Sequence, residues 1–93
     1  MNEVREEIDK IDQQIIALFS KRMKYVDEIV RFKQDEEGVI AAARKDQVLQ
    51  NRARWAEEKG LDPEVFQQMY SLLIEKNIQH ELALLNQKMQ DQQ

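Results

Sequence analysis

Four cationic and two other polar residues of this sequence lie on or beside the apolar faces of its expected helices. They are Arg5, Arg22, Lys33, Arg44, Asn77 and Glu81. Burying a cation is costly unless an anionic group meets it. That anion is either an acidic side chain of the protein or an acidic ligand. Because a forked guanidinium group matches a carboxylate, the set as a whole favours a pocket for a small dicarboxylate.

A purely structural role is the alternative for each of these residues. Arginine and lysine commonly extend along the edge of an apolar stripe or pair with acids, and a polar residue within a stripe sets helix register. Each residue taken singly fits a structural role. The six residues together favour a ligand site about as much as a structural role. The pattern identifies no reaction by itself. His80, the single histidine, is expected at the surface or at the edge of a groove.

The residue types that are absent exclude several kinds of chemistry. The sequence has no cysteine and no threonine, and its serines are Ser20 and Ser71. Thiolate catalysis, cysteine-based zinc sites and disulfides are therefore excluded. Neither serine lies in a recognisable nucleophile turn, so a serine–histidine–acid triad is not predicted. If the protein is an enzyme, we expect it to act without a covalent intermediate or a metal ion.

Length and charge limit the architecture and the partners. The 93 residues predict a single domain over 1–93, and two glycines and one proline among them are typical of a helical protein. A net charge of −4 gives no general attraction to nucleic acid or to an anionic membrane. The sequence contains no apolar run as long as a membrane span and no signal-peptide pattern, so a cytoplasmic location is expected.

The first of three predicted helices covers residues 2–34 and carries an apolar stripe. Its members recur at alternating spacings of three and four residues, which is typical of one helix face that packs against a partner. They are Val4, Ile8, Ile11, Ile15, Leu18, Tyr25 or Val26, and Ile29. Arg22 and Lys33 fall on the same stripe. The acidic, glycine-containing run at 35–38 then ends the helix.

Two shorter helices follow. The second is predicted to begin within 41–44 and to end near 59, with Gly60 as its C-terminal cap and Trp55 in the core. Asp62 as N-cap, followed by Pro63 in the first turn, predicts the start of the third helix. That helix is expected to end near 87, before a frayed tail over 88–93.

The first helix is too long for a compact monomer of this size. A helix of this length spans about 50 Å, whereas a compact domain has a radius of gyration of roughly 12 Å. The stripe therefore predicts an intertwined homodimer. Arg22 and Lys33 are about 16 Å apart along the helix, and Arg5 is about 25 Å from Arg22. Arg5 is thus expected to serve a site of the partner chain, which gives two shared pockets.

These residues and their spacing resemble those of a known family. The layout of the cations and of position 81 over three helices is similar to that of the all-α, type II chorismate mutases, from Val4 to Leu85. Four segments resemble the isochorismate-pyruvate lyase branch of that family, which makes salicylate and pyruvate from isochorismate. They are RMKYV at 22–26, RFK at 31–33, RARWAEE at 52–58 and GLD at 60–62.

The resemblance implies an intertwined helical dimer with two shared active sites and no cofactor. It implies that Arg5 of the partner chain and Arg22, assisted by Arg44, bind the two carboxylates of isochorismate or chorismate. Asn77 is also assigned to substrate binding. Lys33 and Glu81 would flank the ether oxygen of the C–O bond that breaks, in a pericyclic reaction without a nucleophile or base.

Two departures from the family pattern bear on the reaction. Ala41 and Lys45 occupy positions where chorismate mutases commonly carry acids that bind the ring hydroxyl group, which favours the lyase with weak mutase activity. Glu81 stands where bacterial relatives usually have glutamine, and some mutases have glutamate. It must be protonated to donate a hydrogen bond, so activity is expected to rise toward acidic pH. A chorismate mutase that makes prephenate is the alternative, and a non-catalytic dimerisation module is a third possibility.

Overall fold

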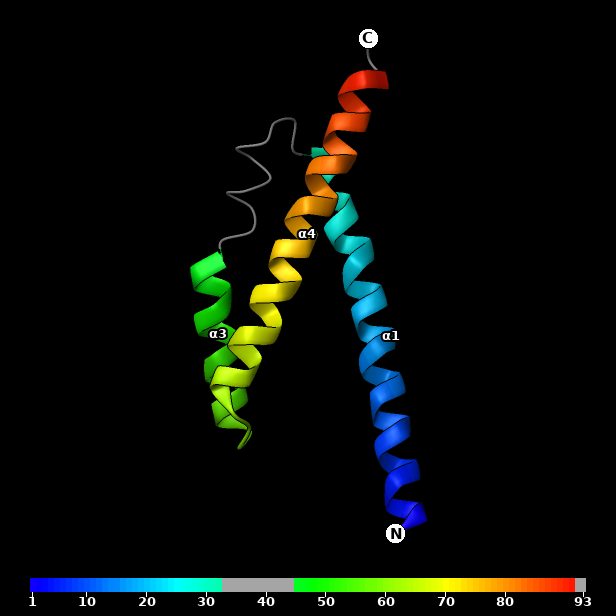
Figure 1. The fold of residues 1–93 in the computed structure, drawn as a ribbon, viewed down its shortest axis with the longest axis vertical. Helices are drawn as coiled ribbons and strands as arrows, with labels where there is room; N and C mark the ends of the chain where they lie inside the picture. Colours follow the sequence, from blue (N-terminus) through cyan, green and yellow to red (C-terminus); the bar gives the residue numbers. More distant parts are fainter. Residues whose placement is uncertain (33–44, 92–93) are drawn as a thin grey trace.

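The computed structural model describes residues 1–32 and 45–91, and these residues form three α-helices and no strand. The helices are α1 (Asn2–Phe32), α3 (Lys45–Glu58) and α4 (Pro63–Asp91), labelled as in Figure 1. The prediction of an all-α fold is confirmed. Lys33 and Arg44, together with Ala41 and the predicted helix break at 35–38, lie outside the described residues.

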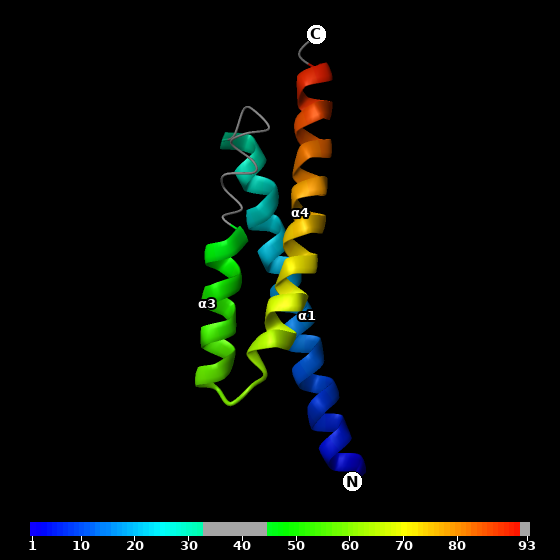
Figure 2. The same ribbon diagram turned by 60° about the vertical axis from the view of Figure 1, so that its left-hand side comes forward.

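The two long helices run in the same direction, and α3 runs in the opposite direction beside the N-terminal half of α4 (Figures 1 and 2). α1 has no glycine or proline and carries Glu3 in its first turn, where an acid stabilises the positive end of the helix dipole. The Arg5 amide donates a hydrogen bond to the Met1 carbonyl oxygen at 3.1 Å and so closes the first turn. The N-terminal end of α1 extends past the corner between α3 and α4 in both views.

The corner between α3 and α4 is built as the sequence predicts. Gly60 has a positive φ of 76°. Its amide donates to the Glu57 carbonyl oxygen at 3.0 Å, and the Leu61 amide donates to the Ala56 carbonyl oxygen at 2.8 Å, which is a Schellman cap. The Asp62 carboxylate then accepts a hydrogen bond from the Glu64 amide at 2.9 Å and caps α4.

Replacing Gly60 with alanine is expected to destabilise the fold by about 1 kcal/mol, because a Cβ atom disfavours the left-handed conformation. Nothing lies within 4 Å of the position of that Cβ atom, so the loss comes from the backbone alone. Thermal unfolding at one fixed protein concentration should show a melting temperature lower by roughly 4–8 °C. Gly60→Asn is the matched control and should lose less, because asparagine tolerates positive φ. Equal melting temperatures for all three proteins would contradict this assignment of the cap.

α4 is longer than its sequence pattern suggests. It continues to Asp91, four residues beyond the expected end near 87. The residues after Leu85 include no glycine or proline, and glutamine, lysine and methionine are good helix formers. Local propensity therefore carries the helix past Leu85, which is 1% exposed and is the last buried position among the described side chains of α4.

Small residues bring α3 close to α4. The buried positions of α3 are Ala53 and Ala56, which allow close approach of the two backbones. The prediction that Trp55 lies in the core is wrong, because its side chain is 48% exposed. It lies on the flank of α3, where the Arg52 guanidinium carbon is 4.7 Å from the centroid of the indole ring.

The molecule is elongated, and most of the α1 stripe is uncovered. The Cα radius of gyration is 16.5 Å and the extents are 59 × 26 × 16 Å, compared with a radius of roughly 12 Å for a compact domain of this length. Val26 is the one fully buried member of the stripe among the described side chains. Its exposed members are Val4, Ile8, Ile11, Ile15, Leu18 and Tyr25. A single chain thus leaves a continuous apolar face on α1 open.

Candidate active site

Tyr70 of α4 is the residue around which the described helices meet. Its ring centroid is 6.4 Å from that of Phe19 on α1. The guanidinium carbons of Arg22 on α1 and Arg52 on α3 lie 5.8 Å and 5.5 Å from the same ring centroid. Arg22 is half-buried, so the prediction that this cation lies on an inward face is confirmed. The aromatic face supports the guanidinium group without neutralising it, which leaves its hydrogen-bond donors available to an anion.

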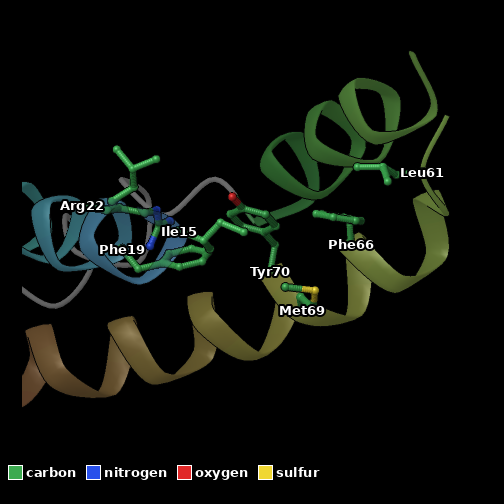
Figure 3. Close-up of a pocket in the computed structure, with 8 residues that line it drawn as sticks. Ile15, Phe19, Arg22, Leu61, Phe66, Met69 and Tyr70 are labelled. Carbon is green, nitrogen blue, oxygen red and sulfur yellow. The ribbon is translucent and has the colours of Figure 1, made fainter. Parts of the chain in front are cut away.

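A cavity of about 440 Å³ lies between the N-terminal half of α4 and α1 (Figure 3). Arg22 is the single charged residue in its wall, which is otherwise made of apolar and aromatic side chains. They are Ile15, Leu18, Phe19, Leu61, Phe66, Met69 and Tyr70. Most of this wall can contact the hydrophobic groups of a ligand, and an anionic group of the ligand can bind only next to Arg22.

Glu81 is the buried acid of the described residues. Its side chain on α4 is 4% exposed. Burial raises the pKa of the Glu81 carboxyl group above its ordinary value, while His80 and Arg22 oppose this rise and Asp27 adds to it. A carboxyl group in these surroundings holds its proton to higher pH than an exposed glutamate does, as a hydrogen-bond donor at this position requires.

The structure brings some of the predicted site residues together and keeps one apart. Asn77 is half-buried on α4, one turn before Glu81, so the two side chains share a face. Arg22 is close enough to Glu81 to lower the pKa of its carboxyl group. Arg5 is exposed near the start of α1, and the helix between Arg5 and Arg22 is continuous over about 25 Å. Within one chain, Arg5 therefore lies away from the Arg22–Glu81 pair.

A contact between a histidine and an aspartate next to this site was not predicted from the sequence. His80 Nε2 and Asp27 Oδ1 are 2.7 Å apart and join α4 to α1. His80 was expected at the surface or at the edge of a groove, and its side chain is indeed 44% exposed. The available signal was the position of the single histidine directly before the acid at 81. The partner Asp27 is 53 residues away in sequence, and no sequence pattern indicates it.

Two general features of the described residues bear on the kind of protein. No helix among them combines the length and the apolar character that crossing a membrane requires. No group of three or more histidine, aspartate or glutamate side chains within residues 1–32 and 45–91 is placed to hold a metal ion.

The fold agrees with comparisons with known proteins. Residues 4–82 match the family of chorismate mutase type II, so the chain belongs to this family of enzymes. Over 72 residues it is 40% identical to the isochorismate pyruvate lyase of Pseudomonas aeruginosa. That match covers 77% of this chain and 71% of the Pseudomonas protein. The three-helix fold and the family resemblance stated from the sequence are thus confirmed.

Proposed function

We propose that this protein is an isochorismate-pyruvate lyase, which converts isochorismate into salicylate and pyruvate without a cofactor. The observation that carries the proposal is the buried carboxyl group of Glu81, which lies close enough to the Arg22 guanidinium group for Arg22 to act on its pKa. One group is suited to donate a hydrogen bond to a departing oxygen, and the other to bind a carboxylate. The chain is also 40% identical to a protein with this activity.

In the proposed reaction the C–O bond of the enolpyruvyl ether breaks and a ring hydrogen passes to the side chain. The side chain leaves as pyruvate and the ring becomes aromatic as salicylate. No protein nucleophile or base takes part, so catalysis comes from holding the reactive conformer and stabilising charge on the ether oxygen. Arg22 binds one substrate carboxylate, and Asn77 and Glu81 contact the substrate from α4. Lys33 and Arg44 are assigned to the ether oxygen and to the Arg22-bound carboxylate by family resemblance.

The lyase is preferred to chorismate mutase because of the start of α3. Lys45 stands where mutases commonly carry an acid, and its Nζ atom lies 3.3 Å from Oε1 of Glu75 on α4. A lysine whose ammonium group is directed toward α4 supplies no carboxylate to accept a hydrogen bond from the ring hydroxyl group of chorismate. Weak mutase activity is expected beside the lyase activity.

We further propose that the working enzyme is a homodimer. The apolar face of α1 is open in the single chain, and the cavity of Figure 3 shares Ile15 and Leu18 with it. An apolar segment of a second copy is the proposed occupant of that face, because burying it supplies stabilisation that the elongated monomer lacks. In such a dimer, Arg5 of one chain completes the Arg22 site of the other.

Offering isochorismate and chorismate separately tests the proposed activity. Salicylate is followed by its fluorescence and prephenate by chromatography. Salicylate formation from isochorismate is expected, and prephenate alone would select the mutase. Neither product between acidic and neutral pH, from a protein whose helical circular dichroism is intact, would rule out both reactions and favour the non-catalytic dimerisation module.

Lyase activity is expected to rise as the pH falls. The active form carries a protonated Glu81, so activity is full below the raised pKa of that carboxyl group and is lost as the pH rises through it. Glu81→Gln replaces the carboxyl group by an amide that donates at every pH. Its kcat should therefore lose this pH dependence and exceed that of the unmodified protein at neutral pH. Identical pH profiles for the two proteins would contradict this role of Glu81.

A further inference from the structure

We infer that the Asp27–His80 pair is a positioning element of the active site, which fixes α1 against α4 and places a carboxylate and an imidazole group near the Glu81 carboxyl group. This inference deepens the proposed function and rests on it for its activity readout. His80 is the residue directly before Glu81, and Asp27 lies on the helix that carries Arg22. Neither residue is assigned a contact with the substrate.

The pair completes a two-point attachment between the long helices. The first point is the contact of Phe19 with Tyr70, and the second is the 2.7 Å contact between Asp27 and His80. The two points are about 12 Å apart on α1 and about 15 Å apart on α4. Arg22 lies between the two points on α1, as Asn77 does on α4. Two contacts fix both the separation and the register of α1 against α4, whereas a single contact would leave one helix free to turn about that point.

The same pair acts on Glu81 by charge. The His80 ring lowers the pKa of the Glu81 carboxyl group and Asp27 raises it. A positive histidine alone would favour an ionised Glu81, whose negative charge opposes the charge that develops on the ether oxygen. Asp27 bonded to His80 offsets that effect, so that burial holds the pKa of Glu81 above its ordinary value.

Other charged groups lie near Asp27 and His80, and their effects on the pKa of Glu81 do not replace the effect of this pair. Arg22 of α1 also lowers the pKa of Glu81. α3 begins at Lys45, whose ammonium group is paired with Glu75, six residues before Glu81. Two further charged residues lie within about one turn of Asp27 on α1, and one lies a turn before His80 on α4. They are Lys24, Glu28 and Lys76. None of these three is among the groups that shift the pKa of Glu81.

Two near-isosteric substitutions separate charge from attachment. Asp27→Asn keeps an oxygen that accepts a hydrogen bond from the His80 ring and removes the negative charge. His80→Gln keeps a donor for Asp27 and removes the ring that becomes positive. Asp27→Asn is expected to move the midpoint of the activity–pH profile to lower pH, and His80→Gln to higher pH, each by roughly half a pH unit. The double variant should fall between them, and both shifts should shrink in high salt.

Glu28→Gln is the matched control, because it removes the exposed negative charge next to Asp27 on α1 and should leave the midpoint unchanged. Titration of the Glu81 carboxyl carbon by NMR, assigned through its loss in Glu81→Gln, should show the same opposite shifts without substrate. Shifts in one direction, or none, would overturn the inference. If the titration shifts as expected but neither substrate is converted, the pair is established and the proposed function is wrong.

Discussion

Arg22→Ala is expected to lower kcat/KM for isochorismate by roughly 10²- to 10³-fold, because it removes the donor group for a substrate carboxylate. The guanidinium group is half-buried against Tyr70, at 5.8 Å from the ring centroid, beside the buried Glu81. A substrate carboxylate that enters this apolar surrounding loses its water and depends on that group for replacement hydrogen bonds. Steady-state kinetics at the acidic optimum would measure the loss.

Arg22→Lys separates charge from geometry. It keeps the positive charge but has no fork that matches a carboxylate, so an intermediate loss of roughly 10-fold or more is expected. Arg54→Ala is the matched control, because Arg54 is an exposed arginine of α3 that pairs with Glu58 at 3.9 Å. Its removal should leave kcat/KM unchanged and alter stability by less than about 1 kcal/mol.

A loss of activity in Arg22→Ala also has a structural explanation, since the contact with Tyr70 helps to join α1 to α4. Thermal unfolding distinguishes the two explanations. If Arg22→Lys keeps the melting temperature of the unmodified protein and still loses activity, the guanidinium group acts on the substrate. If activity follows the melting temperature through all three variants, Arg22 is a packing residue and its assignment to the site is wrong.

Local signals in the sequence predict the corner of the fold well. Gly60 and Asp62 act within a few residues of themselves, through a left-handed backbone and a side-chain cap, so their roles are readable without tertiary structure. Helical spacing likewise places Arg22 and Glu81 on inward faces, because the period of 3.6 residues is fixed by the backbone. These predictions needed no knowledge of how one helix packs on another.

The features that were missed depend on packing between helices. Trp55 is exposed because Ala53 and Ala56 face α4, and the helix period alone does not say which of two apolar flanks is covered. The contact between Asp27 and His80 depends on the register of α1 against α4, which the contacts along both helices set together. The family resemblance supplied roles for Arg5 and Glu81. It gave no role to Asp27 or His80, so it did not predict the contact between them.

Arg5→Ala and Arg22→Ala, each nearly inactive alone, are expected to regain activity when mixed. In a dimer with shared sites, one chain gives Arg5 and the other gives Arg22 to each site. A heterodimer of the two variants then has one site that lacks both arginines and one that is intact. With equal amounts and random exchange, about a quarter of all sites are intact, so about a quarter of the unmodified activity is expected. The measurement is salicylate formation after mild denaturation and joint refolding.

The geometry of α1 makes this result a strict test of where Arg5 acts. Arg5 and Arg22 are about 25 Å apart on one continuous helix, so a small dicarboxylate does not bridge them within a chain. If both arginines served the same site from one chain, every chain in the mixture would carry a defect and activity would stay at the level of the variants. Refolding each variant alone is the control for recovery, and sedimentation of the unmodified protein should give twice the 11.1 kDa mass of one chain. A monomeric mass together with full activity would show that Arg5 serves no partner, and the exposed stripe of α1 would then need another explanation.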